Sequence, residues 1–172
     1  MLMTVEQSRR LPSEVTEFTE LQRGELVPVT QPKMRHTKLQ RRLLDLLEPM
    51  AKQRGVVMSE MPFRPLREYE FRRADVAFTS QARWDQAVEE DELFGSPELV
   101  IEILSPSNTK AEMRERAALC LSTGCQEFWV VDPVAQTVGV TDRSGQESLY
   151  QAGSRIPLPL FASELELDAA FL

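Results

Sequence analysis

The sequence predicts a single mixed α/β domain with a central sheet flanked by helices, and three observations support this fold class. First, 172 residues of which 42% are hydrophobic and 27% charged suit one globular domain with a sizeable core. Second, two apolar runs, 98–104 and 126–133, have the composition of buried strands. Third, a helical pattern over 110–123 joins these runs, which favours a parallel right-handed crossover.

The first part of the chain predicts a loose lead-in followed by a hairpin. Residues 1–17 form the expected lead-in, and 18–172 form the expected domain. The stretch FTELQRGELVPVT at 18–30 predicts two short strands that turn at Arg23-Gly24. We therefore expect a β-hairpin to precede the first long helix.

The first long helix is expected to begin near Pro32 and to stop before Gly55. Its buried face is an apolar stripe formed by Leu39, Leu43, Leu46, Leu47 and Met50. Residues 56–71 read as an extended segment with a proline-containing loop. The alternating stretch RRADVAFTS at 72–80 predicts a strand, and the acidic stretch 84–97 predicts a surface loop or a short helix.

The second half of the chain supplies the crossover helix and a second hairpin. Thr109 and Glu112 fit a capping box that opens the helix, and Gly124 closes it. A further hairpin is expected over 137–151. The proline-rich tail is expected to end in a short apolar helix over 163–172.

Charge and composition exclude several classes of protein. The net charge of −7 argues against a protein that coats nucleic acid without specificity, although it leaves room for a local basic cleft. Two cysteines, Cys120 and Cys125, do not make a disulfide framework, so we expect a cytoplasmic location. No apolar run approaches the length of a membrane span, so we expect no membrane partner.

Two acids stand out because each lies inside an apolar strand. Glu102 is the centre of the run LVIEIL, and Asp75 lies within RRADVAF. A carboxylate in apolar surroundings is costly unless it is paired, protonated or bound to a metal. Hard divalent cations such as Mg²⁺ are held by one or two carboxylates together with water and substrate phosphates. The alternative is that each acid ends a strand and meets solvent or an arginine.

Two cationic groups are candidates for the same site. Arg116 borders the apolar face of the helix over 110–123, from which it can extend over the sheet toward Glu102; the alternative is that its stem covers apolar surface while its head meets water. His36 is the only histidine and lies at the start of the first helix, where the alternative to a role in the site is a purely structural one. The segment around it is basic, which suits either phosphate contact or an ordinary solvated face: Lys33, Arg35, Lys38, Arg41 and Arg42.

Taken together, these stretches resemble the PD-(D/E)XK nuclease superfamily, and within it the bacterial Uma-two family of restriction-endonuclease-like proteins. The stretches that carry the resemblance extend over roughly residues 18–170: GELVPVTQPKMRHTKLQRRLLDLL, RRADVAF, PELVIEILSPSNTK and ALCLSTGCQEFWVVDP. The resemblance implies a restriction-endonuclease-like fold, a mixed central sheet flanked by helices with added β-hairpins. It also implies DNA as substrate and Mg²⁺ or Mn²⁺ as cofactor. Members of the family often pair, so the apolar C-terminal tail is a candidate surface for a homodimer.

The resemblance also assigns the site residues. The first acidic position of the family falls on Asp75 and the second on Glu102, which with the backbone carbonyl of Ile103 would ligate the metal. The family histidine falls on His36, where it would orient the phosphate. The family lysine falls on Arg116, which would steady the attacking water or the developing charge.

The exchange of lysine for arginine at position 116 is the main departure from the family pattern. Arginine binds phosphate well but stays protonated, so it is a poor proton shuttle. The resemblance therefore implies a metal-dependent DNA endonuclease of weakened activity. The alternative is a catalytically degenerate binding or assembly module, in which Asp75, Glu102 and Arg116 remain as a structural ion-pair cluster.

Overall fold

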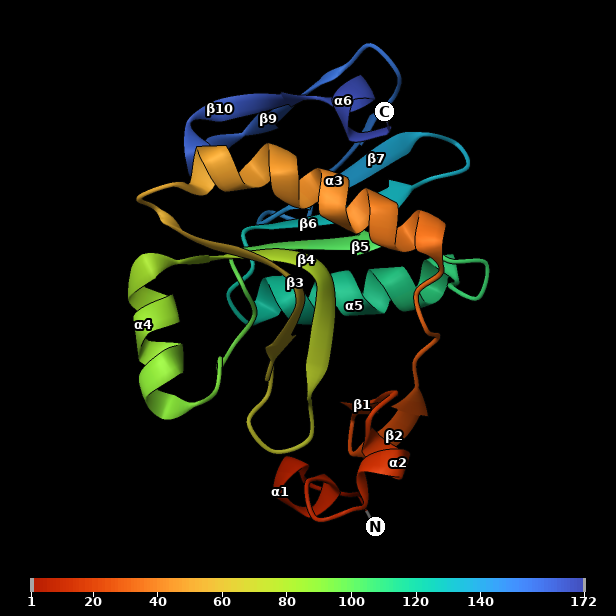
Figure 1. Ribbon diagram of the computed structural model, residues 1–172, viewed down its shortest axis with the longest axis vertical. Coiled ribbons are helices and arrows are strands. Elements are labelled where there is room, and N and C mark those ends of the chain that lie inside the picture. The colour runs from red at the N-terminus through yellow and green to blue at the C-terminus, as the bar shows by residue number, and fades with distance from the viewer. Residues whose placement is uncertain (1, 172) are drawn as a thin grey trace.

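The centre of the molecule is a six-stranded mixed sheet, seen in the computed structural model, which describes residues 2–171 (Figure 1). In spatial order its strands are β3 (Gly55–Phe63), β4 (Arg72–Ser80), β5 (Leu99–Ile103), β6 (Glu127–Asp132), β7 (Thr137–Asp142) and β8 (Glu147–Tyr150). Only β5 and β6 run parallel; every other neighbouring pair is antiparallel. The predicted fold class is confirmed, and the three predicted strands β4, β5 and β6 are adjacent.

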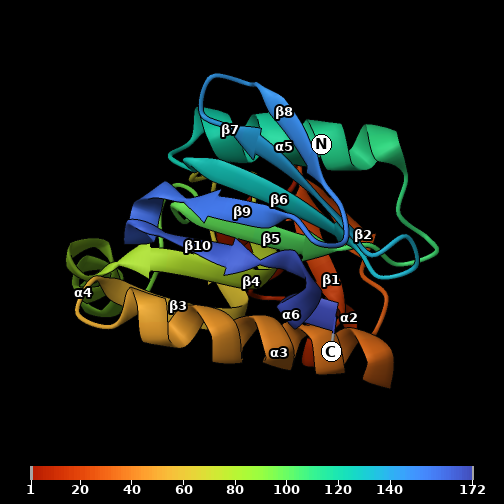
Figure 2. The same cartoon turned by 90° about the horizontal axis from the view of Figure 1, so that it is seen from above.

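Helices cover both faces of this sheet. Helix α3 (Met34–Ala51) lies on one face and α5 (Lys110–Ser122) on the other, as Figures 1 and 2 show. The predicted stripe of α3 packs on the sheet: Leu39, Leu43 and Leu47 are buried, whereas Leu46 and Met50 are only partly buried at its margin. The core on the α3 side is centred on Trp129, and the core on the α5 side on Phe128, because successive residues of β6 point to opposite faces.

Local signals set the ends of α5, as the sequence predicts. The Thr109 hydroxyl accepts the Glu112 N–H, and the Glu112 carboxylate accepts the Thr109 N–H, which closes the capping box. Gly124 follows the helix with a φ of 121°, which favours glycine. The parallel crossover β5–α5–β6 is thereby fixed at both of its turns.

The N-terminal segment is more ordered than a loose lead-in. It contains two single-turn helices, α1 (Val5–Ser8) and α2 (Ser13–Thr16), and the predicted hairpin of β1 (Thr19–Gln22) and β2 (Glu25–Pro28). A second capping box, between Thr4 and Gln7, holds α1, and the Val5 side chain is fully buried. This unit packs at one end of β3 and β4, below the sheet in Figure 1.

One segment keeps one of its two predicted forms and another differs from its prediction. The acidic stretch forms the short helix α4 (Gln81–Glu90), which begins before the predicted segment. The tail forms a hairpin of β9 (Arg155–Leu158) and β10 (Ser163–Glu166) joined by the 3₁₀ turn η1 (Pro159–Phe161), so the predicted helix over 163–172 is reduced to α6 (Leu167–Phe171). The reason is cross-strand packing of Leu165 on Ile156, which stabilises the alternating sequence SELE as a strand.

The apolar tail is buried within its own domain. Leu165, Leu167 and Ala170 are at most 2% exposed and pack with α3 and the sheet in one core. This tail is therefore not an exposed surface for a second copy, contrary to the expectation from sequence.

Candidate active site

Asp75 and Glu102 meet where β4 and β5 run side by side. The last pair of this antiparallel ladder is Val76 with Ile101, and Asp75 and Glu102 are the next residues along the two strands. The Asp75 Oδ2 atom accepts the backbone N–H of Ile103 at 2.7 Å. The structure thus places the Asp75 carboxylate against the backbone of Ile103, the residue that follows Glu102 on β5.

Helix α3 approaches Asp75 from one face of the sheet. The His36 Nε2 atom lies 3.0 Å from Asp75 Oδ1, and Gln40 Nε2 donates to the Asp75 carbonyl at 3.2 Å. Burial alone would lower the pKa of His36, but the hydrogen bond and charge of Asp75, with the charge of Glu60, outweigh burial and raise that pKa. The imidazole is therefore biased toward its protonated form beside the carboxylate.

Helix α5 approaches Glu102 from the other face. The Arg116 Nε atom donates to Glu102 Oε1 at 2.9 Å, and the Arg116 side chain is only 11% exposed. The predicted contact between these residues is present. The alternative, in which the guanidinium meets water, is wrong because this group lies buried against Glu102.

Glu20 is a site residue that the sequence did not reveal. It lies on β1, and its carboxylate accepts two bonds from Arg116, at 2.9 Å and 3.2 Å. It also accepts the Arg73 backbone N–H at 2.8 Å, and its side chain is 4% exposed. Glu25 occupies the other strand of the same hairpin and is exposed, and no local pattern distinguishes the two glutamates.

Arg116 is nearly saturated with protein partners. Besides Glu102 and Glu20, its guanidinium donates to the Arg73 carbonyl. Four of the five N–H groups of an arginine are thereby engaged, counted from these bonds. One N–H is left for water or for a substrate.

Burial is the largest single influence on the pKa values of Glu102, Glu20 and Arg116, but it sets the direction of the shift only for Glu102. It raises the pKa of Glu102 well above the usual range; Arg116 opposes the rise, while Asp75 and Glu20 add to it. For Glu20, burial is outweighed by the charge and hydrogen bonds of Arg116 and by the Arg73 N–H and the Arg72 charge, so its pKa is lowered. Burial would lower the pKa of Arg116, but Glu102 and Glu20 raise it, so Arg116 stays protonated.

The donor groups at Asp75 and Glu102 fit a hard divalent cation. Carboxylate and carbonyl oxygens are the ligands that Mg²⁺ and Mn²⁺ prefer. The charge of Asp75 raises the pKa of Glu102, which is a like-charge repulsion that a cation between them would relieve. Within residues 2–171, no three acidic, histidine or cysteine side chains gather tightly enough to form a metal site from side chains alone. Water or substrate oxygens would complete the coordination.

The surroundings of the site are basic on the α3 side. The amino ends of α3 and α5 and the carboxyl end of β5 lie at the same edge of the molecule, on the right in Figure 1. Arg41 pairs with Asp45 and Arg42 donates to the Ala169 carbonyl, so these two have structural roles. The other basic residues of this segment are exposed: Lys33, Arg35 and Lys38.

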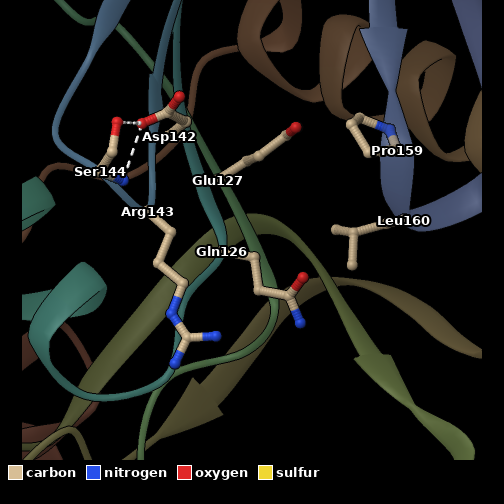
Figure 3. A pocket seen from close by; sticks show the side chains of 7 residues that line it. All are labelled: Gln126, Glu127, Asp142, Arg143, Ser144, Pro159 and Leu160. Carbon is tan, nitrogen blue, oxygen red and sulfur yellow. Dashed lines mark hydrogen bonds between the residues drawn. The ribbon is translucent and has the colours of Figure 1, made fainter.

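A separate open pocket of about 230 Å³ lies at the other end of the sheet (Figure 3). Its walls come from the start of β6, the turn after β7, and η1, including Glu127, Arg143 and Leu160. Glu127 pairs with Leu99 at the amino ends of the parallel strands, whereas Glu102 lies near their carboxyl ends. This pocket is not part of the candidate active site.

A comparison with solved structures supports the fold. A solved structure described as "a putative nuclease belonging to DUF820" from Anabaena variabilis superposes with a TM-score of 0.83 at 23% identity, covering 98% of this chain and 97% of the other. At that identity the likeness shows the fold. None of the curated proteins matches the chain significantly.

The sequence also matches a family model. That model, Uma2, carries the description "Putative restriction endonuclease" and matches residues 5–170. The match begins at α1 and ends in α6, so it includes Glu20, Asp75, Glu102 and Arg116. This chain therefore belongs to the Uma2 family.

Proposed function

We propose that this protein is a metal-dependent endonuclease that hydrolyses phosphodiester bonds in DNA. The observation that carries the proposal is the position of the Asp75 carboxylate, which accepts the Ile103 N–H next to Glu102 and lies against His36. The family description and the fold of the solved neighbour support a nuclease-like function. A cytoplasmic location and pairing of two copies belong to the same proposal.

In this proposal Asp75, Glu102 and the Ile103 carbonyl hold Mg²⁺ or Mn²⁺. When bound, such an ion supplies an activated water and neutralises the charge that develops on the phosphate. The Ile103 N–H fixes one Asp75 oxygen, and His36 fixes the other, so the carboxylate is oriented before the ion arrives. Glu102 Oε1 is fixed by Arg116.

The phosphate is oriented from the α3 side. The Nε2 atom of His36 contacts Asp75, so in this proposal the other ring nitrogen of the protonated imidazole donates to the phosphate. The exposed cations Lys33, Arg35 and Lys38 belong to the same basic segment. Positive side chains near a helix amino end favour the approach of a phosphate. A local basic edge of this kind reconciles DNA binding with a net charge of −7.

Arg116 makes the activity weak. Its guanidinium holds its proton, and four of its N–H groups already bind Glu20, Glu102 and Arg73. It therefore stabilises charge but cannot exchange a proton with the attacking water.

The test is nicking of supercoiled plasmid by the purified protein, with Mg²⁺ or Mn²⁺ under matched salt. We expect slow nicking that is faster with Mn²⁺. Asp75→Ala removes it, while Asp85→Ala, a change at an exposed carboxylate on α4, leaves it unchanged. Nicking that survives Asp75→Ala would show that another site, or a contaminant, is responsible.

A second function is favoured by the saturation of Arg116. If the cluster of Glu20, Arg116 and Glu102 is purely structural, the domain keeps the nuclease fold as a binding or assembly module. Mn²⁺ titration separates the two functions. The nuclease binds Mn²⁺ in the parent protein and loses binding in Asp75→Ala, whereas the module shows no such difference.

A further inference from the structure

The ladder between β3 and β4 is interrupted opposite Asp75. Ser59 pairs with Val76 and Met61 pairs with Ala74, so the register sets Glu60 against Asp75, yet these two residues form no ladder pair. Glu60 has a φ of 52°, a left-handed conformation in the middle of a strand. Such a conformation is strained for a residue other than glycine and is common at functional sites.

The interruption also changes which residues face which core. On β4, Ala74 and Ala77 belong to the core on the α5 side, whereas Val76 and Phe78 belong to the core on the α3 side. Strict alternation would place Ala74 with Val76. The strand therefore rotates at Asp75, and Figure 1 shows β4 as a bent strand.

The buried side chain of Gln40 bridges the interruption. Its Nε2 atom donates to the Asp75 carbonyl at 3.2 Å and to Glu60 Oε1 at 2.6 Å. Gln40 is 5% exposed, while Glu60 is exposed at the surface. An amide from α3 thus bonds an Asp75 carbonyl that has no ladder partner on β3, and Glu60 fixes the direction of that amide.

We propose that Glu60 is a positioning residue of the candidate active site, which acts through Gln40 to hold Asp75 out of the ladder and against His36 and Ile103. The expected effect of Glu60 on DNA cleavage rests on the proposed nuclease function, but its effect on the position of Asp75 does not. The strained backbone is retained because it points the Glu60 carboxylate at Gln40. Among the site residues, Glu60 is the one supplied by the outer strand β3.

The informative variant is Glu60→Gly, because glycine relieves the strain while it removes the carboxylate. The matched control is Gln136→Gly: Gln136 is exposed, has a φ of 53° and lies between β6 and β7, away from the site. If Glu60 were only a strained surface residue, the two variants would behave alike. Each would keep or raise the Tm, and neither would change the active site.

The first readout is the NMR signal of the imidazole of His36, the only histidine in the chain. Because His36 Nε2 contacts Asp75 Oδ1, movement of Asp75 shifts this signal. The charge of Glu60 also acts on His36 directly, so the reference is Glu60→Gln, which removes the charge but keeps an oxygen for Gln40. We expect the signal in Glu60→Gly to differ from that in Glu60→Gln, and the signal in Gln136→Gly to match the parent. Equal signals in Glu60→Gly and Glu60→Gln overturn the inference, whether or not the protein cleaves DNA.

The second readout is plasmid nicking with Mn²⁺. We expect Glu60→Gly to lose activity about tenfold, since misplacement of one catalytic group has effects of this order or larger. Glu60→Gln, which keeps an oxygen for Gln40, restores nicking to near that of the parent. If the parent nicks and Glu60→Gly nicks equally well, the inference is wrong; if the parent does not nick, only the proposed function fails.

Discussion

The guanidinium of Arg116 donates two hydrogen bonds to the carboxylate of Glu20, from Nη1 to Oε2 at 2.9 Å and from Nη2 to Oε1 at 3.2 Å. The planar fork of arginine matches a carboxylate in this way, whereas the ammonium group of lysine does not. Glu20 comes from the N-terminal hairpin and Arg116 from α5, so the pair also joins the hairpin to this helix. The arginine at position 116 is therefore adapted to its neighbours in this chain.

Glu20 and Glu102 should differ in their effects on stability without metal. Glu20→Gln removes the bidentate partner of a buried cation, and we expect it to lower the free energy of unfolding by about 3 kcal/mol. Glu102→Gln removes a buried charge whose pKa is raised, while Arg116 keeps Glu20, so we expect a change of less than about 1 kcal/mol or a gain. Urea unfolding of both variants measures the difference. Equal large losses would favour the structural ion-pair cluster and hence the binding module.

Arg116→Lys should increase nicking of supercoiled plasmid. A lysine in a partly desolvated site can exchange a proton near neutral pH, and such catalysis contributes about 10²-fold or more in favourable cases. We expect a smaller gain of about tenfold here, because the ammonium group of the lysine will pair with Glu20 for part of the time. The exposed Arg114→Lys, on the same helix, serves as the control.

The gain in Arg116→Lys should disappear when Asp75→Ala is added. If Arg116→Lys instead lowers a clear parental activity, Arg116 is an electrostatic stabiliser of the reaction. If neither protein nicks DNA but both bind Mn²⁺ through Asp75, the metal site is real and the substrate is different.

Stability should fall with rising pH through the titration of His36. Its pKa is raised in the folded protein by Asp75 and Glu60 against the effect of burial. The folded state therefore binds this proton more tightly than the unfolded chain. The stabilisation is complete below the ordinary histidine pKa of about 6.5 and is lost as the pH rises through the raised value.

The measurement is the free energy of unfolding in urea between about pH 6 and pH 9, a range that brackets a raised histidine pKa. We expect His36→Gln to have a shallower dependence than the parent, and Asp75→Asn to lower the pKa of His36 in NMR titration. Ionisation of Glu102 also lowers the free energy of unfolding as the pH rises, because its raised pKa means that protonation favours the folded state. A parent and a His36→Gln variant with the same pH dependence would contradict the assignment.

The capping box of α5 should contribute to stability. Thr109→Ala leaves the Glu112 N–H without its side-chain acceptor, and we expect a loss of about 1 kcal/mol. Thr109→Ser keeps the hydroxyl and should retain most of the stability. Thermal unfolding of the two variants tests this, and identical Tm values would show that the cap contributes nothing.

The sequence by itself determined the elements whose signals are local. Alternation and continuous apolar runs predicted β4, β5 and β6, the stripe of leucines predicted α3, and the pair Thr109 and Glu112 predicted the start of α5. The acids Asp75 and Glu102 were recognisable because a carboxylate is costly inside an apolar strand. Each of these signals lies within a single strand or helix and can therefore be recognised from neighbouring residues in the sequence.

Only the tertiary structure decided which partners those residues have. Glu20 lies 96 positions from Arg116 and looks like any other hairpin glutamate until the hairpin packs against α5. The gap opposite Asp75 arises from a left-handed Glu60, which no local composition requires. The tail became a hairpin because Leu165 packs on Ile156 and the core beneath, a contact that outweighs its helical pattern. In each case the deciding free energy comes from burial and pairing between segments distant in sequence, which periodicity along the chain does not contain.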